Sequence, residues 1–323
     1  MQGIENKRIL GLIQGTALGD SFGMPTEMMT LEKIREHGKI TEMLPSFDDS
    51  VISRNQPAGS ITDDTCHSLM IMQMLKQNHG KVNVQNYIDT LLQWRKNSPI
   101  AQFVTGPSTE KALNLIQQGV PVEQTGKMGS TNGCCMKIAP LGIYYDYQNK
   151  ESLVKATAEI CLPTHNTTIA IQGASSIVCA SNYLLTGHYD FEEMMENVYE
   201  CINIAGKYGY QWPSASLIYR IKKALSIVDE TDNDDDDLKW RLYNEIGTSF
   251  ETIDTVPVVF ALLKKSQFDI YRFCFLSSSV GGDTDTIGAI GAALCGAAYP
   301  EKIKEKDIRR IQKVNHLDFS KMI

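Results

Sequence analysis

The sequence has no apolar run as long as the roughly 18 residues that a membrane-spanning helix requires. Its first residues also lack the layout of a signal peptide, because Glu5, Lys7 and Arg8 precede an amphipathic stretch that glycines interrupt. The first absence argues against a membrane partner and the second against export. We therefore expect a cytoplasmic protein that does not bind a membrane.

Cysteine motifs and positive charge are scarce as well. The eight cysteines form no C-x-x-C pair, and most stand among apolar or small residues, as reduced core cysteines do. This pattern argues against a disulfide framework. The formal net charge is −7 and the pI is about 5.5, so broad binding to nucleic acid is not expected.

No Pro/Ser-rich linker divides the chain, and strand-like alternation of apolar and polar residues is rare. With 42% hydrophobic and 21% charged residues, a chain of 323 residues can build a sizeable core. We expect an all-α fold, compact and single-domain over residues 1–323, and a monomer because no heptad pattern is present. Helical spacing is found in segments 82–95, 108–118, 151–160, 168–185, 191–206, 214–228, 237–249, 256–264 and 268–276.

Acidic residues are concentrated at two expected helix starts near opposite ends of the chain. Residues 62–65 (TDDT) precede an apolar stretch that runs to Leu75. Residues 283–286 (DTDT) precede a Gly- and Ala-rich stretch that Pro300 ends. The small side chains at 288–298 favour the close approach of a neighbouring helix.

These acids have two possible roles. Thr and Asp are ordinary N-cap residues, and acids near a helix N-terminus interact favourably with the helix dipole. A cap needs only one oxygen, however, whereas each cluster supplies two carboxylates and several hydroxyls that would be costly to pack together without a cation. Two divalent cations about 3.5–4 Å apart can be held by such oxygens and can activate a water. Taken together, the clusters predict one metal site.

Five segments of the chain, in the same order, resemble the motifs of the ADP-ribosylglycohydrolase family. They are residues 15–27 (GTALGDSFGMPTE), 62–65 (TDDT), 131–141 (TNGCCMKIAPL), 164–166 (THN) and 281–286 (GGDTDT). The resemblance covers nearly the whole length. It implies an all-helical fold with a dinuclear magnesium or manganese site that cleaves the glycosidic bond at C1 of an ADP-ribosyl group.

The resemblance also implies residue roles by position in these motifs. The cofactors would be two divalent cations, Mg²⁺ or Mn²⁺, and their ligands would be Thr62, Asp63, Asp64, Asp283, Asp285 and Thr286. Catalytic roles fall to Glu27, Asp63 and Asp64. We assign Glu27 to general acid or base work and a metal-activated water to the nucleophile, since carboxylates stabilise the positive charge that develops on the sugar.

Substrate contacts are implied for the glycine-rich loop at residues 126–133, for Gly106 and for a histidine. Glycines allow successive backbone N–H groups to face an anion, although a Gly/Asn-rich stretch is also a common turn. The implied substrate-binding residues are Gly106, Gly129, Ser130, Asn132, Gly133 and His165. The partner would be an ADP-ribosyl-type small molecule or an ADP-ribosylated protein.

Two positions depart from the family pattern and leave the substrate open. Thr105 stands where many members carry Asp, and Lys137 stands where many carry Arg, whose bidentate fork Lys lacks. One alternative is therefore an N-glycosidase for a smaller nucleoside-like compound. A second is a non-catalytic ADP-ribose-binding protein, which the six metal positions and Glu27 argue against.

Overall fold

The computed structural model describes residues 3–52, 55–231 and 233–322, and the regular structure within these ranges is helical. Apart from helices, backbone pairing there is limited to three isolated bridges, which join Met29 to Gly282, Thr131 to Glu251 and Thr167 to Tyr210. The prediction of an all-α fold is confirmed.

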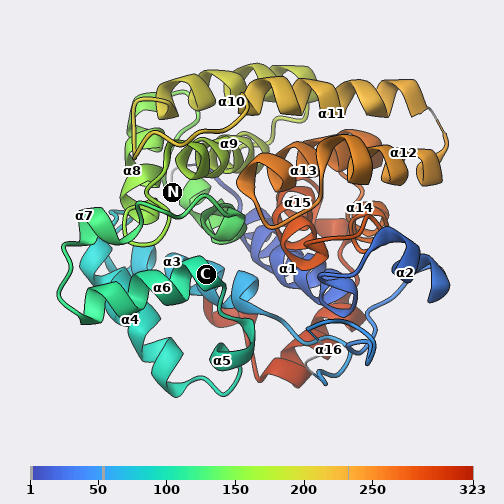
Figure 1. The fold of residues 1–323 in the computed structure, drawn as a ribbon, viewed down its shortest axis with the longest axis horizontal. Coiled ribbons are helices and arrows are strands. Elements are labelled where there is room, and N and C mark those ends of the chain that lie inside the picture. The colour runs from blue at the N-terminus through green and yellow to red at the C-terminus, as the bar shows by residue number, and fades with distance from the viewer. Residues whose placement is uncertain (1–2, 53–54, 232, 323) are drawn as a thin grey trace.

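Two helices from opposite ends of the chain, α1 (Asn6–Gly23) and α15 (Thr284–Ala298), form the centre of the fold (Figure 1). Small residues four apart line the contact on both helices, so they share one face. A Cβ atom on Gly15 would overlap the backbone carbonyl of Ala292, and one on Gly19 would overlap that of Gly288. The two backbones are thus in direct contact. The C-terminal end of α1 consequently lies beside the N-terminal end of α15.

Apolar helices enclose this central pair. The helices α9 (Thr168–Leu185) and α13 (Thr252–Ser266) pack against α15, and α10 (Phe191–Ala205) and α11 (Leu217–Thr231) cover them as an outer layer (Figure 1). Nearly every residue of α9 and α15 is buried, which is why these helices are apolar on all sides. Even so, no helix in the described ranges combines the length and apolar character needed to cross a membrane.

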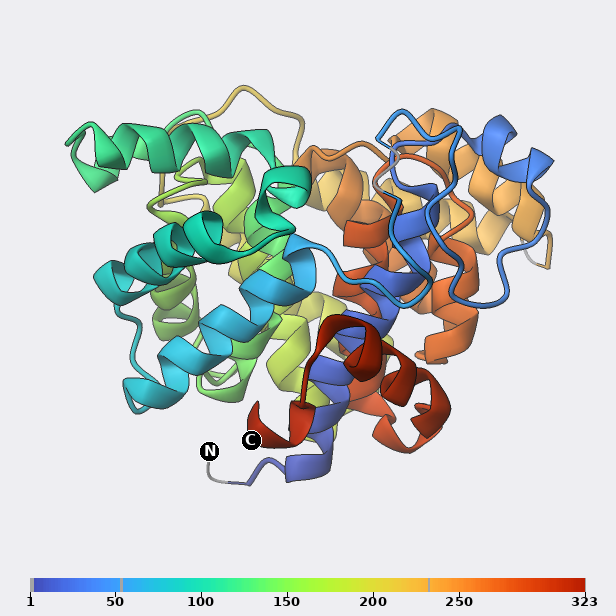
Figure 2. The same cartoon turned by 90° about the horizontal axis from the view of Figure 1, so that it is seen from below.

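The remaining helices build the flanks of the molecule (Figure 2). One flank holds α3 (Asp63–Gln77), α4 (Val84–Asn97), α5 (Ala101–Val104), α6 (Pro107–Gln117), α7 (Val122–Thr125) and α8 (Lys150–Cys161). The others are α2 (Leu31–Glu36), α12 (Asp235–Arg241), α14 (Ile270–Ser277) and α16 (Glu305–Asn315). Short 3₁₀ segments include η1 (Met24–Thr26), η2 (Asn132–Lys137), η3 (Ala139–Ile143), η5 (Pro300–Lys302) and η6 (Phe319–Met322).

Helix positions follow the sequence pattern closely, with two informative differences. The predicted bounds 168–185 are those of α9. By contrast, α13 begins at Thr252, ahead of the predicted start at residue 256. Pro257 therefore lies inside the helix and not at its start. Tertiary burial of α13 outweighs the hydrogen bond that a proline removes. The helix predicted at 237–249 is two elements in the structure. The helix α12 ends at Arg241, and the chain then forms a π-helical stretch, η4 (Leu242–Ile246).

Replacing Gly15 with Ala should destabilise the protein by about 1–3 kcal/mol, because the added methyl group would push α1 away from α15. Gly106→Ala is the matched control, since a Cβ atom there meets no atom within 4 Å. Urea unfolding of both variants measures the difference. Equal stability of the two variants would contradict the close-packed contact.

Candidate active site

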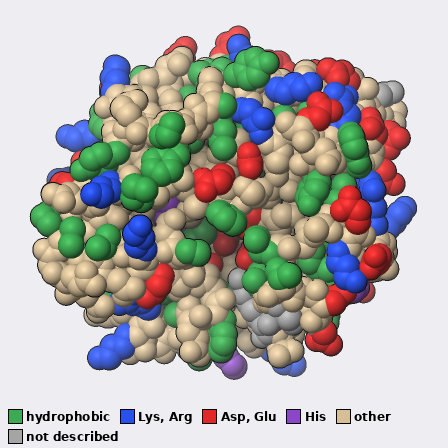
Figure 3. Space-filling model, viewed as in Figure 1, with side chains coloured by type: hydrophobic (Ala, Val, Ile, Leu, Met, Phe, Trp, Pro, Cys, Tyr) green, Lys and Arg blue, Asp and Glu red, His purple; other side chains and the backbone are tan. Residues whose placement is uncertain are grey.

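A cavity of about 420 Å³ opens beside the C-terminal end of α1 and the N-terminal ends of α3 and α15. Five carboxylates line it, and they are those of Glu27, Asp63, Asp64, Asp283 and Asp285. Figure 3 shows acidic atoms inside a hollow near the centre of this face, with hydrophobic side chains around it. The sequence clusters 62–65 and 283–286 therefore meet in space.

A larger cavity, of about 560 Å³, lies between α2, α12 and α14. Two of its three acids form ion pairs, Asp235 with Arg272 and Asp236 with Lys239, and the third, Asp234, caps α12. The smaller cavity instead gathers five carboxylates, and burial and mutual repulsion raise the pKa of two of them, Asp64 and Asp283. The smaller cavity is thus the candidate active site.

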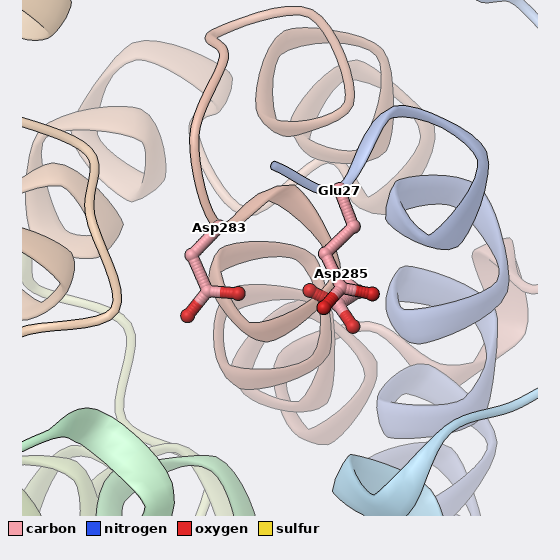
Figure 4. A group of neighbouring side chains, drawn as sticks. All are labelled: Glu27, Asp283 and Asp285. Carbon is pink, nitrogen blue, oxygen red and sulfur yellow. The ribbon is translucent and has the colours of Figure 1, made fainter. Parts of the chain in front are cut away.

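Helix starts position the acids at this site. Thr62 is the N-cap of α3, and its hydroxyl donates to Asp64 at 3.1 Å. Asp283 is the N-cap of α15, and its side chain makes no capping hydrogen bond, so its carboxylate is available to the cavity. Glu27 follows η1 at the end of α1. Oxygens of Glu27, Asp283 and Asp285 lie within 4.8 Å of one another and could hold a metal ion (Figure 4).

Burial makes this cluster electrostatically unfavourable without a cation. Burial, followed by repulsion from Asp285, raises the pKa of Asp64 and of Asp283 well above the ordinary value. One oxygen of Asp64, Oδ1, is buried and makes no hydrogen bond. Carboxylate and hydroxyl oxygens in this arrangement are the donor set of a hard divalent cation. The residues present therefore fit a metal site.

The loop before η2 and His165 form a second wall. The Asn132 amide donates to Asp283 and, at 2.7 Å, to Thr255, so it holds that carboxylate in place. The His165 ring lies 3.0 Å from the Thr131 hydroxyl. Burial, and then the positive charge of Lys137, lowers the pKa of His165 well below its ordinary value. His165 is thus a neutral ring that can exchange hydrogen bonds with a hydroxyl.

Most of the predicted site residues line the cavity, but three do not. Gly106, Asn132, Gly133, His165 and Thr286 line it together with the five carboxylates. The residues that do not line it are Thr62, Gly129 and Ser130. Ser130 donates to Glu251 at 2.9 Å, and the carbonyl of Gly129 accepts from Thr167 at 2.6 Å. These two residues fasten the loop to its neighbours in this structure, and their substrate contacts stay a prediction.

Asp20 is a site residue that the sequence reasoning missed. Its carboxylate, buried in α1, accepts the backbone N–H groups of Thr62 at 3.0 Å and Thr65 at 3.2 Å, and also the Thr65 hydroxyl. Burial, and then repulsion from Asp285, raises its pKa to about 7. It therefore anchors the first turn of α3. The sequence carried a signal for this role, because Asp20 stands in an apolar, small-residue stretch that is expected to be buried. A buried acid needs a hydrogen-bond or ionic partner.

The two departures from the family pattern have different surroundings. Thr105 lines the cavity, and its hydroxyl donates to the carbonyl of Ala101 at 2.6 Å. Lys137 is fully buried, with its Nζ 5.5 Å from the centre of the Tyr87 ring, and does not line the cavity. Only the Thr105 replacement thus alters the cavity wall itself.

We expect Asp20→Asn to weaken Mn²⁺ binding by about 10–100-fold, because replacing a residue that orients the metal ligands typically lowers metal affinity by that factor. Asp89→Asn, an exposed replacement on α4, is the control. Titration of Mn²⁺ followed by electron paramagnetic resonance measures both affinities, and thermal unfolding in a chelator checks folding. Unchanged affinity in a folded Asp20→Asn variant would refute the anchoring role.

Comparison with known proteins places this geometry in context. The family model described as ADP-ribosylglycohydrolase matches residues 1–319. The chain is 31% identical to the uncharacterized protein YegU of Escherichia coli (strain K12), over 98% of this chain and 96% of that protein. It is 24% identical to ADP-ribosylhydrolase ARH3 of Homo sapiens, over 90% of this chain and 85% of that protein.

A solved structure shares the fold. It is described as an ADP-ribosylglycohydrolase-related protein complex, and it matches with a TM-score of 0.70 at 21% identity, covering 98% of this chain and 95% of that one. The family match spans almost the entire sequence and includes both acidic clusters. This chain is therefore a hydrolase of the ADP-ribosylglycohydrolase family.

Proposed function

We propose that the protein hydrolyses the glycosidic bond at ribose C1 of an ADP-ribosyl group carried by a protein side chain or a small molecule. The observation that carries the proposal is the convergence of five carboxylates from three parts of the chain on one cavity. Loss of a leaving group from C1 builds positive charge on the ribose, and nearby carboxylates stabilise that charge.

The acidic residues at the two helix starts would hold two divalent cations, Mg²⁺ or Mn²⁺. The proposed ligands are Thr62, Asp63, Asp64, Asp283, Asp285 and Thr286. When bound, such ions orient ribose hydroxyls and lower the pKa of a coordinated water. Around them, the Asn132 amide would keep Asp283 in position. The two ring nitrogens of His165 contact the hydroxyls of Thr131 and Thr164, so the ring would orient the Thr131 hydroxyl at the cavity wall.

Glu27 is the proposed general acid or base. Its oxygens lie close to those of Asp283 and Asp285, whereas its backbone directly follows η1, so it approaches the cluster from another side (Figure 4). Glu27 takes a proton from the attacking water and returns a proton to the leaving group. Asp63 and Asp64 stabilise the charge on the sugar.

The free state of the cysteines supports a reducing compartment. All eight are free and seven of them are buried, which is usual for proteins of the cytoplasm and not for small secreted ones. We therefore include a cytoplasmic location in the proposal. A monomeric state is also proposed, on the separate ground that the sequence has no heptad pattern.

A second candidate function is hydrolysis of a smaller, nucleoside-like substrate. Among the described residues, no Lys or Arg lines the cavity, and Arg54 lies outside those residues. Two divalent cations would not fully neutralise the five carboxylates around them, so the site would keep a net negative charge of one. A diphosphate would thus enter without a cationic side chain to receive it, whereas an uncharged nucleoside would not need one.

Glu27→Gln should lower turnover by about 10²–10⁴-fold, which is the usual contribution of a positioned acid or base. Because Gln retains an oxygen at the same position, metal binding should persist. Glu32→Gln, an exposed replacement on α2, should behave as wild type. Hydrolysis rates and Mn²⁺ affinity are compared for the three proteins. Unchanged turnover in Glu27→Gln would remove Glu27 from the mechanism.

Calorimetric titration of ADP-ribose into the magnesium-loaded protein tests the proposed substrate. We expect binding that requires Mg²⁺ and is lost in an Asp283→Ala/Asp285→Ala variant, because the ions would orient the ribose. Binding that is equal with and without Mg²⁺, and equal in the variant, would contradict the proposed site. If the metal-loaded protein binds adenosine but not ADP-ribose, the nucleoside candidate replaces the first.

A further inference from the structure

The cavity of about 560 Å³ between α2, α12 and α14 shares no lining residue with the candidate active site. Figure 1 shows these three helices together on the right-hand side of the molecule. The volume falls within the range of about 300–1,000 Å³ that is usual for cavities that bind small molecules. This second cavity is therefore large enough to hold a ligand of its own.

Positive charge lines the second cavity. Four cationic residues contribute to its wall, and they are Arg35, Lys39, Lys239 and Arg272. By contrast, none of the described residues that line the active-site cavity is Lys or Arg. An anionic ligand would thus meet cationic side chains in the second cavity and carboxylates in the first.

The three acids of the second cavity already have partners. Oδ2 of Asp235 lies 2.5 Å from Nη2 of Arg272, and Oδ1 of Asp236 lies 2.7 Å from Nζ of Lys239. The carboxylate of Asp234 accepts two backbone N–H groups in the first turn of α12. These contacts use Lys239 and Arg272 and leave the charges of the other two cations unmatched.

Arg35, in the last turn of α2, and Lys39, just after that helix, are the two remaining cations. Both are exposed, and neither forms an ion pair with any residue that the structure describes. The hydrogen bond and charge of Lys239 lower the pKa of Asp236, and the charges of Arg35 and Lys39 lower it further. The two cations therefore act on the cavity from the side opposite α12.

The more deeply buried part of the wall is apolar. Ile34 and Ile40 on the α2 side and Leu276 on α14 are almost fully buried, and Phe275 is partly buried beside them. A simple inorganic ion would gain nothing from this surface. An apolar or aromatic group, however, would be removed from water there.

We propose that the second cavity binds a small organic phosphate, with its phosphate group between Arg35 and Lys39 and an apolar or aromatic portion on the inner wall. A phosphate monoester carries about 1.5–2 negative charges at pH 7, which two cations match better than they match a single carboxylate. The fork of N–H groups on Arg35 can also bind two phosphate oxygens. A nucleoside monophosphate has both parts of such a ligand.

Calorimetric titration of the magnesium-loaded protein tests this site with three probes. They are adenosine 5′-monophosphate (AMP), ribose 5-phosphate, which lacks the ring, and adenosine, which lacks the phosphate. We expect AMP to bind most tightly, because it alone offers both a phosphate and an aromatic ring. Equal affinities for AMP and ribose 5-phosphate would contradict the role of the apolar wall.

The variant Arg35→Gln/Lys39→Gln locates the binding. We expect it to lose about 100-fold in affinity for AMP, because each charge-assisted hydrogen bond typically contributes about a factor of ten. Lys306→Gln/Lys313→Gln is the matched control, since it removes two exposed lysines of α16 that do not line the cavity. The control should bind AMP as wild type does. Thermal unfolding of both variants excludes a folding defect.

Two results would overturn the site. One is a wild type that does not bind AMP. The other is AMP binding that is unchanged in Arg35→Gln/Lys39→Gln, which would place the ligand elsewhere, for example at the metal ions of the active site. Because the two cavities share no lining residue, neither result depends on whether the protein hydrolyses a ribosyl bond.

Discussion

The structure depends above all on the backbone contact between α1 and α15. Glycines at positions 15, 19 and 288 allow the two helices to touch without intervening side chains. Since the helices are antiparallel, this contact brings the end of the first motif beside the start of the last one, and so places Glu27 against Asp283 and Asp285. The chemistry of the cavity is therefore a consequence of small residues in the core.

Burying several carboxylates together raises the free energy of the folded state. Hydrogen bonds and positive charge can both offset this cost. Hydrogen bonds hold the individual acids, as when Asn132 donates to Asp283 and the first turn of α3 donates to Asp20. The remaining repulsion calls for positive charge, since burial and mutual repulsion raise the pKa of Asp64 and Asp283. In the proposed function, a divalent cation would supply that charge at the point where a ribosyl substrate would need it.

The all-α fold could be predicted from local pattern. The meeting of the two acidic clusters could be predicted from chemistry, because carboxylates packed together need a shared cation. Helical spacing locates α9 to the residue, and acids at two helix starts suggest one shared metal site. The other contacts between distant segments could not be derived from the sequence. The capping of α3 by Asp20, the burial of Lys137 against Tyr87 and the exposed ring of Phe250 depend on which helices become neighbours.

Anomalous diffraction from crystals of the protein soaked in Mn²⁺ tests the central claim most directly. The account predicts two manganese peaks between the N-terminal ends of α3 and α15, with carboxylate oxygens of Asp63, Asp64, Asp283 and Asp285 among their ligands. Absence of manganese from this cluster, in a protein that still hydrolyses a ribosyl conjugate after treatment with a chelator, would contradict it.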